Sequence, residues 1–305
     1  MTANNPRQVF DSFRVLDAFK SALIKELGAT PNTIEPGPIL RFDDPKGKRG
    51  NQACFCQLFS DGHPAGYFGN WRTGFYQTWV YGGVSSMTPA ERQQFSQQIA
   101  QAKQQREKER AERQQKAQEK ALYLWEQAYR ARPEHPYLIK KQVSPNNLRQ
   151  HGTVLLVPLY VDGQLVNLQR IYSNDDKRFL SGGRITGAYS VIGLLPNSPQ
   201  VYVCEGWATG ATIHQQTRAP VLCAMNAGNL KPVAAQLRAA MPDSRIIIAG
   251  DDDRETEGNP GATKAIEAAQ HIGGEVLFPQ WPADAPTSLT DFNDLAIHLM
   301  RNAYG

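Results

Sequence analysis

Acidic residues directly follow two apolar runs of this chain. The run Val201–Cys204 leads into Glu205, and the run Ile246–Ala249 leads, one glycine later, into Asp251–Asp253. Short continuous apolar runs are typical of buried parallel strands, and open α/β sheets place their sites at the carboxyl ends of such strands. Because clustered carboxylates repel one another unless divalent cations lie between them, the pattern indicates a site for Mg2+ or Mn2+. Such metals serve phosphoryl transfer, so the sequence favours an enzyme that acts on nucleotides or nucleic acid.

Either acidic motif by itself has a simpler interpretation. A single Glu after a strand is usually a solvated loop residue, and consecutive Asp residues are common in turns and helix caps. The two motifs stand about 45 residues apart with a strand–helix unit between them, and this joint position favours the metal site. By alternation along an extended chain, Asp252 points away from the side that Asp251 and Asp253 share, so it is the weaker ligand candidate.

The second half of the chain alternates predicted strands and helices. This alternation predicts a parallel sheet flanked by helices. The expected strands are 201–204, 220–225, 245–250 and 275–278, and the expected helices are 207–217, 229–240 and 260–271. Upstream, residues 153–160 and 164–172 predict a β-hairpin, because Asp162-Gly163 between them is a strong signal for a two-residue turn.

Several motifs together resemble the Toprim domain of primases, topoisomerases and some nucleases. The hexapeptide EGWATG at 205–210 is close to the EGYATA motif of primases encoded by conjugative plasmids and satellite phages. The basic segment KRFLSGG at 177–183, with the two strands before it, resembles a segment of bacterial primases. The motifs occur in the expected order over roughly residues 123–299. The resemblance implies an α/β Toprim domain, with a parallel sheet flanked by helices, after an upstream basic primase subdomain.

The resemblance also implies roles for the acidic residues. Glu205 would serve as a metal ligand or a general acid–base, and Asp251 and Asp253 would be the metal ligands of a DxD motif. Asp291, in the segment DFND, matches the late acidic motif of primases and would be a further ligand. The spacing in DFND departs from the usual DxD pattern, which leaves Asp294 either a ligand or the N-cap of a helix over 295–300.

EGWATG departs from the family in a second way. Cellular primases carry another acidic residue a few positions after the Glu, where this chain has Thr209 or Gly210. The substitution would remove one metal ligand. Gly206 and Gly210 allow close approach of the backbone at the start of helix 207–217, and its N-terminus is favourable for an anion.

Basic residues near these motifs are candidates for binding nucleotide or DNA. Lys177, which we also predict to be catalytic, and Arg178 would place cations opposite the acidic cluster. The alternative is a solvated hairpin end, because Asp175 and Asp176 precede them. Weaker candidates, each of which has an ordinary turn or surface role as its alternative, are Asn226, Lys140, Lys141 and Lys264.

The N-terminal part predicts a helix that Gly28 ends and an antiparallel meander over 41–84 that is rich in Gly and aromatic residues. Aromatic and basic side chains hold single-stranded nucleic acid in many proteins, but aromatics in a short meander are more often its core. The candidates for either role are Phe42, Lys46, Lys48, Arg49, Phe55, Tyr67, Phe68, Trp71, Arg72, Phe75, Tyr76 and Trp79. We do not expect zinc, because Cys54, Cys56 and His63 lack a second Cys pair.

Between these parts, residues 88 to about 132 predict one long helix. Thr88 is a suitable N-cap, and Glu91 three residues later completes a capping box. Few large apolar residues follow, which favours a solvated connector over a basic arm that touches nucleic acid. We therefore expect four parts: an N-terminal α+β module with a candidate template-binding role, a connector helix, a basic primase subdomain and a Toprim catalytic domain, over 1–86, 87–132, 133–196 and 197–305.

Composition narrows the class of protein. The 305 residues are 41% hydrophobic with a net charge of +4, which suits a folded protein of about two domains. No apolar run approaches the ~18 residues of a membrane span, and MTANNPRQVF lacks the apolar segment of a signal peptide. Four cysteines do not make a disulfide framework in a chain of this length, so we expect a cytoplasmic protein.

These observations predict a DNA primase that makes short primers on single-stranded DNA from nucleoside triphosphates by two-metal phosphoryl transfer. No GxxxxGK[ST] motif occurs, so a replicative helicase would be a separate partner. A Toprim nuclease would use the same carboxylates with water as the nucleophile, and the KRFLSGG segment favours the primase. A non-catalytic protein that binds single-stranded DNA would not need the acidic cluster. A topoisomerase would need a large additional domain that carries a catalytic Tyr.

Overall fold

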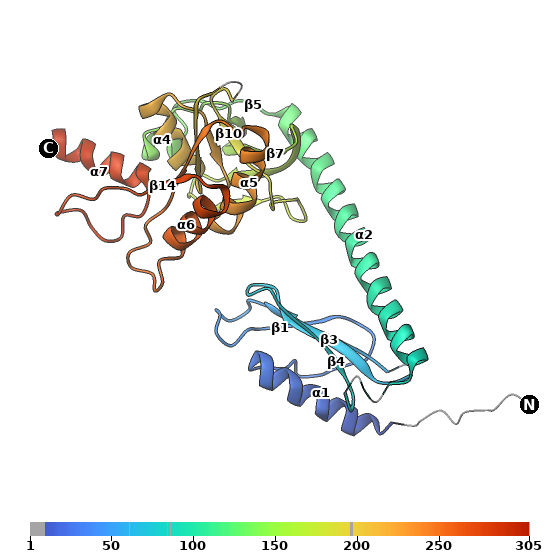
Figure 1. Ribbon diagram of the computed structural model, residues 1–305. Coiled ribbons are helices and arrows are strands. Elements are labelled where there is room, and N and C mark those ends of the chain that lie inside the picture. The colour runs from blue at the N-terminus through green and yellow to red at the C-terminus, as the bar shows by residue number, and fades with distance from the viewer. Residues whose placement is uncertain (1–9, 61, 84, 86, 196–197, 305) are drawn as a thin grey trace, which may run out of the picture. The chain divides into compact units, whose positions relative to one another are not determined.

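The computed structural model describes residues 10–60, 62–83, 85, 87–195 and 198–304 (Figure 1). The chain divides within helix α2 (Pro89–Gln127) into two compact units, Met1–Glu107 and Lys108–Gly305. Some expectations fall outside the described residues: that 1–9 form no signal peptide, and that the meander reaches residue 84.

The first unit packs a helix on a four-stranded sheet (Figure 1). Helix α1 (Ser12–Leu27) begins at Asp11, whose side chain accepts from the Phe13 backbone N–H, and ends at Gly28 with φ of 73°. The predicted meander is confirmed: all neighbouring strands pair antiparallel in chain order. The strands are β1 (Leu40–Phe42), β2 (Cys54–Phe59), β3 (Ala65–Asn70) and β4 (Phe75–Val80).

The core of this unit explains most of its aromatic and cysteine residues. The apolar face of α1 packs against one face of the sheet, where Cys54 and Cys56 lie fully buried. Tyr67 and Phe68 are also fully buried, whereas Trp71 and Tyr76 are 59% and 49% exposed. The interpretation of these aromatics as core therefore holds for most of them but not for the last two.

Helix α2 begins as predicted and ends earlier than predicted. The Glu91 carboxylate accepts from the Thr88 N–H at 2.7 Å, and Thr88 Oγ1 accepts from the Glu91 N–H, which forms the expected capping box. The helix was expected to reach about residue 132 but stops at Gln127, because Tyr129–Arg130 pair as strand β5 with strand β6. Sheet pairing outweighs the local helical pattern there.

The second unit opens with an antiparallel sheet in the order β5-β6-β7-β8-β9. The predicted hairpin is confirmed, and Asp162 and Gly163 at its turn have φ of 49° and 75°, as a type I′ turn requires. The last turns of α2 pack on one face of this sheet around Ala121. The elements are α3 (Pro136–Lys141), β6 (Arg149–His151), β7 (Val154–Val161), β8 (Gln164–Ile171) and β9 (Lys177–Phe179).

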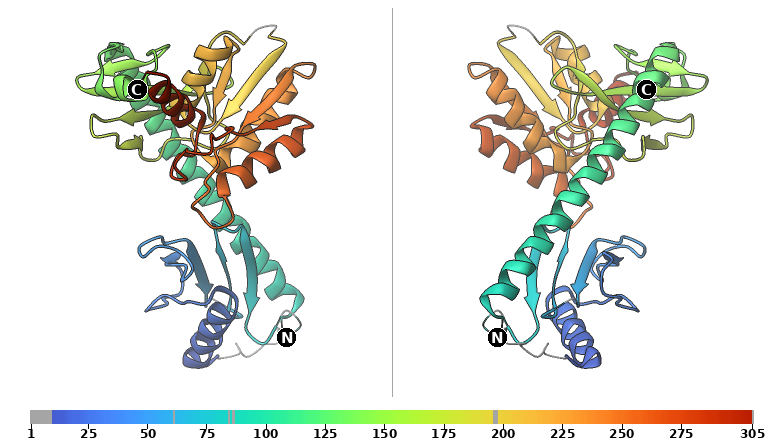
Figure 2. Two further views of the ribbon diagram at one scale, coloured as in Figure 1. Left: turned by 90° about the vertical axis from the view of Figure 1, so that its left-hand side faces the viewer. Right: turned by 90° about the vertical axis from the view of Figure 1, so that its right-hand side faces the viewer.

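A second sheet in the same unit has the order β10-β12-β11-β13-β14 (Figure 2). Its neighbouring strands are parallel except β10, which pairs antiparallel with β12. The α/β prediction is thus confirmed, with boundaries that differ by one or two residues and an edge strand, β10, that was not expected. The strands are β10 (Ser190–Ile192), β11 (Gln200–Cys204), β12 (Val221–Cys223), β13 (Arg245–Ala249) and β14 (Glu275–Leu277).

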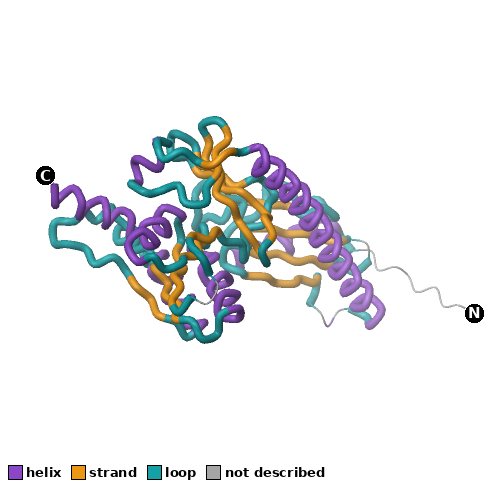
Figure 3. Tube along the Cα trace, turned by 90° about the horizontal axis from the view of Figure 1, so that it is seen from above, coloured by secondary structure: helices purple, strands orange, loops and turns teal. Residues whose placement is uncertain are grey.

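Helices cover both faces of this sheet (Figures 2 and 3). Helices α5 (Leu230–Ala240) and α6 (Pro260–Ile272) pack on the face that carries Val203 and Ile248. Helix α4 (Trp207–Thr217) packs on the other face, where the core continues into β7 and α3. The two sheets of the unit therefore share one hydrophobic core, which fixes the first sheet relative to the carboxyl edge of the second.

Two shorter features complete the unit. Helix α7 (Phe292–Tyr304) packs beside α4, and a 3-10 turn, η2 (Ala227–Asn229), follows β12. The buried Asn229 side chain accepts from the Gly187 N–H and donates to the Ala188 and Ala224 carbonyls, which ties the chain before β10 to the end of β12. None of the helices in the described residues combines the length and apolar character of a membrane-spanning segment.

Candidate active site at the carboxyl edge of the parallel sheet

Strand register brings the two acidic motifs to one place. Cys204 at the end of β11 pairs with Ala249 at the end of β13, so Glu205 and Asp251 leave adjacent strands at the same edge. Cys204 also pairs with Cys223 of β12, which brings Asn226 to that edge. The expectation that adjacent strands deliver these side chains together is met because β11 lies between β12 and β13.

The carboxylates are half-buried and act on one another. Burial, followed by the neighbouring Asp291 and Glu205 carboxylates, raises the pKa of Asp251 to about 8. Burial and then Asp253 raise the pKa of Glu205, although the Ala227 backbone N–H, which bonds its carboxylate, lowers it. Such perturbed acids in one cluster are typical of a functional site. Negative charge at this edge is costly without a cation.

Asp291 joins the cluster from the start of α7. Its Oδ1 accepts from the Asp294 N–H at 2.8 Å and its backbone carbonyl accepts from the Leu295 N–H, so Asp291 caps the helix. Its Oδ2 accepts from the Thr209 hydroxyl at 3.1 Å. Burial and the Asp294 carboxylate raise the pKa of Asp291. The sequence left Asp294 as either a metal ligand or the helix cap. The structure shows that Asp291, and not Asp294, is the cap.

Asp294 lies in the first turn of α7 instead. Its Oδ2 accepts from the Thr290 N–H at 3.3 Å, and its Oδ1 lies 3.3 Å from the Lys141 ammonium. Asn293 donates to the Lys141 carbonyl and to the Thr212 hydroxyl. These contacts join the start of α7, where Asp291 lies, to α3 and α4.

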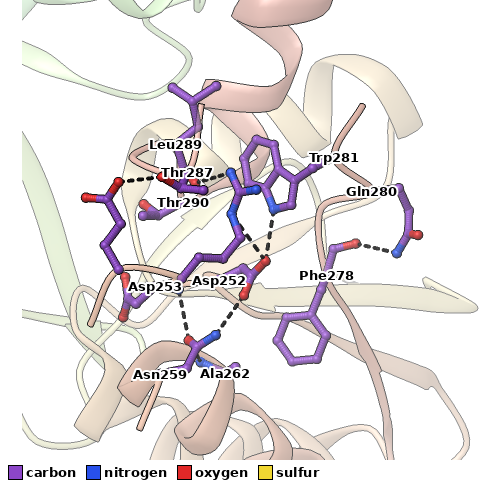
Figure 4. Close-up of polar contacts among 12 residues, drawn as sticks. Asp252, Asp253, Asn259, Ala262, Phe278, Gln280, Trp281, Thr287, Leu289 and Thr290 are labelled. Carbon is purple, nitrogen blue, oxygen red and sulfur yellow. Dashed lines mark hydrogen bonds and ion pairs between the residues drawn. The ribbon is translucent and has the colours of Figure 1, made fainter. Parts of the chain in front are cut away.

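Asp252 and Asp253 point in different directions, as the alternation predicted (Figure 4). Asp252 accepts from Trp281 Nε1 at 2.9 Å and from Asn259 Nδ2 at 2.7 Å. Asp253 turns toward the start of α6, where its Oδ2 accepts from the Gly261 N–H at 3.0 Å. Asp252 is therefore a structural residue of the loop.

That loop also positions Asp291. The Asp252 N–H donates to the Thr290 carbonyl at 2.7 Å, one residue before Asp291. The Arg254 guanidinium lies 4.4 Å over the Trp281 ring and donates to the Leu289 carbonyl. The chain between β14 and α7 is thus fastened to the loop after β13, which sets the late acidic motif beside Asp251.

Lys177 supplies a cation to this cluster. The residue as a whole is exposed, but its ammonium lies 5.5 Å over the Tyr137 ring, and desolvation there, followed by Lys141, lowers its pKa. Asp291, Asp175 and Asp251 act in the opposite direction. Arg178, the next residue on β9, pairs with Asp176 at 2.8 Å. Alternation along the strand separates the two cations that the sequence placed together.

The other candidates lie as follows. Lys140 pairs with Asp175, and Lys264 pairs with Glu267 of its own helix at 2.8 Å, as an ordinary surface lysine would. Gly206 is the N-cap residue of α4. Gly210 is packed against the sheet, because a Cβ there would lie 2.4 Å from Cys223 Sγ. The missing side chain therefore lets α4 pack closely on the hydrophobic core.

Sequence reasoning did not assign three contributors: Thr209 as a partner of Asp291, Tyr137 beneath Lys177, and Trp281 behind Asp252. Their partners lie between 29 and 82 residues away along the chain. No local pattern marks such pairs.

The chemistry of the donor set fits a hard divalent cation. The donors are carboxylate oxygens, and Asp251 Oδ1 is buried without a hydrogen-bond partner among the described residues. No three His, Cys, Asp or Glu side chains in the described residues already form a metal site. Of the residues considered for zinc in the first unit, His63 has its Nε2 at 2.8 Å from the Tyr81 carbonyl oxygen.

Residues 200–299, which contain this sheet edge and its carboxylates, match the Toprim domain family. The chain is also 36% identical over 90% of its length to a DNA primase TraC of Escherichia coli, and 30% identical over 80% to another DNA primase TraC of the same organism. The prediction of a Toprim-domain relative of the DNA primases is confirmed.

The chain spans 27% and 18% of the length of these two relatives. Among solved structures, it is similar to the DnaG primase catalytic domain bound to ssDNA, with 15% identity, a TM-score of 0.36 and coverage of 50% of this chain and 49% of that one.

Proposed function

We propose that the chain is a DNA primase that joins nucleoside triphosphates into short primers on single-stranded DNA. The observation that carries the proposal is the half-buried carboxylate cluster of Glu205, Asp251 and Asp291, which faces the Lys177 ammonium. Similarity to the TraC primases supports it.

In this proposal Glu205, Asp251, Asp253 and Asp291 hold Mg2+ or Mn2+, which neutralises charge on the triphosphate and on the primer 3′-oxygen. The Thr209 hydroxyl and the Asp294 N–H orient the Asp291 carboxylate. Lys177 contributes a positive charge toward a phosphate group, and the Tyr137 ring holds the ammonium in place.

The partners belong to the proposal as well. Arg178, Lys140 and Lys141 would contact the template or triphosphate, each after exchange of its present carboxylate partner. Asn226, Gly206 and Lys264 are weaker candidates for the same contacts. A separate helicase would supply unwound template, and the reaction would take place in the cytoplasm.

The second candidate is a Toprim nuclease with water as the nucleophile. The Lys177 ammonium beside the acidic cluster favours the primase, because a cation there can hold a triphosphate. Incubation of the protein with circular single-stranded DNA, labelled nucleoside triphosphates and Mn2+ separates the two. A primase produces labelled oligonucleotides that Asp251→Asn abolishes, whereas a nuclease linearises the circle and incorporates no label.

A further inference from the structure

One end of the N-terminal unit gathers cations around an exposed tryptophan. Lys46, Lys48 and Arg49 lie in the loop between β1 and β2, and Trp71 and Arg72 begin the turn between β3 and β4. We call these five residues the loop–turn surface. All five are exposed, and Trp71 is 59% exposed.

The loop and the turn are packed together. A Cβ on Gly47 would lie 2.7 Å from the Arg72 guanidinium and 2.8 Å from the Asn51 amide nitrogen, so the loop and the turn approach each other closely here. The Trp71 indole N–H donates to the Gln52 carbonyl at 3.2 Å, and its backbone N–H donates to the Ala53 carbonyl. The exposed ring therefore has a set position before any ligand binds, which lowers the entropy cost of binding.

The acidic residues of the loop are turned inward. Asp43 accepts from the Gly50 and Gln52 N–H groups at 2.6 and 2.8 Å. Asp44 accepts from the Lys46 N–H and from Asn70 Nδ2. These hydrogen bonds are the main cause that lowers the pKa of both carboxyls. The negative charges of Asp43 and Asp44 are thus hydrogen-bonded to backbone N–H groups of the loop itself.

The basic side chains, in contrast, are exposed to solvent. Lys46, Lys48, Arg49 and Arg72 form no ion pair within 4.0 Å among the described residues, although Asp43 attracts Arg49, and Asp44 attracts Arg72 and Lys46. A hydrophobic core does not need Trp71 either, because buried aromatics such as Tyr67 and Phe68 already fill it. The surface offers a flat ring beside four cations.

We propose that the loop–turn surface binds single-stranded DNA, with Trp71 stacking on a base and the four cations contacting phosphates. Stacking on aromatic side chains within a basic surface is how proteins hold single strands without reading sequence. Single-stranded DNA is the partner because it is the template of the proposed priming function, on which this inference rests. A polyanion without bases could contact the four cations but could not stack on the Trp71 ring.

The test measures binding of the full-length protein to a fluorescent mixed-sequence oligonucleotide by anisotropy, in EDTA and without nucleotides. We expect Trp71→Ala to weaken binding about fivefold to a hundredfold, the range that stacking of one base provides. Trp71→Phe keeps a ring and should stay within about threefold of the wild type. Heparin, which has no bases, should bind Trp71→Ala and the wild type equally.

The cations are tested by salt dependence. Removing Lys48 and Arg49 together should reduce the slope of log K against log salt by about 1.4, since each phosphate contact on a single strand contributes about 0.7. The matched control is Arg14→Ala with Lys25→Ala, two exposed residues of α1 that pair with acids of the same segment. The control should leave the slope unchanged.

Three results would overturn the proposal. They are unchanged affinity of Trp71→Ala, an equal loss of slope in the α1 control, and an equal loss of heparin binding by Trp71→Ala. Melting curves establish that each variant is folded. DNA binding is measured without metal or nucleotide, so it does not depend on primer synthesis. If the wild type makes no primers but Trp71→Ala still weakens DNA binding, the proposed function is refuted and the proposal for this surface stands.

Discussion

The Thr209 hydroxyl donates a hydrogen bond of 3.1 Å to Asp291 Oδ2 across 82 residues of chain. Thr209 stands in the segment of the EGWATG motif where cellular primases carry an additional acidic residue. Here the side chain supplies no carboxylate of its own and instead orients one that arrives from α7. Because the Asp294 N–H bonds Oδ1, both oxygens of Asp291 are fixed by hydrogen bonds.

We expect Thr209→Val to reduce primer synthesis about tenfold, since a hydrogen bond to a charged acceptor contributes about 1.5–3 kcal/mol. Thr209→Ser keeps the hydroxyl and should retain most of the activity. Titration of the rate with Mn2+ measures the effect. If Thr209→Val requires no more metal than the wild type and synthesises at the same rate, orientation of Asp291 has no role in the reaction.

The raised pKa of Asp251, about 8, predicts a pH dependence of the metal-free protein. Between about pH 4 and pH 8 the folded state keeps a proton that the unfolded state releases, so the free energy of unfolding falls as pH rises. Denaturant titrations in EDTA measure this fall.

Asp251→Asn should flatten the decline, while its residual slope reflects Glu205 and Asp291, whose pKa values are also raised. The same variant should abolish primer synthesis. A decline as steep in Asp251→Asn as in the wild type would contradict burial of an ionisable group at this position.

Lys177→Ala should strongly reduce primer synthesis, because a cation that acts on Glu205, Asp251 and Asp291 is lost. Any loss of DNA affinity should come with a shallower salt dependence. Lys25→Ala is the matched control: it removes the same charge from an exposed side chain of α1 that pairs with Glu26, and we expect near-normal synthesis. Equal effects of the two substitutions would mean that Lys177 acts only through net charge.

Asp252→Ala should destabilise the protein by about 2–4 kcal/mol, because the substitution leaves Trp281 Nε1 and the Asn259 amide without their acceptor. Asp252→Asn keeps one oxygen and should cost about half as much. Urea unfolding gives both values. Glu255→Ala removes a neighbouring carboxylate that bonds the exposed Thr287 hydroxyl and should cost less than about 1 kcal/mol.

Much of this protein is determined by its local sequence. The apolar runs before Glu205 and Asp251 specify buried strands that end in carboxylates, and Asp162-Gly163 specifies its hairpin turn. Such features depend on side-chain periodicity and backbone preferences, which act over a few residues. The α/β class, the shared sheet edge and the opposite direction of Asp252 could therefore be predicted.

Tertiary structure decided the rest. Helix α2 stops at Gln127 because the next residues pair with β6, and Asp291 rather than Asp294 caps α7. Packing also leaves Trp71 outside the core. These outcomes depend on which distant segments meet, and the free energy of such contacts comes from burial and hydrogen bonds between residues that no local pattern relates.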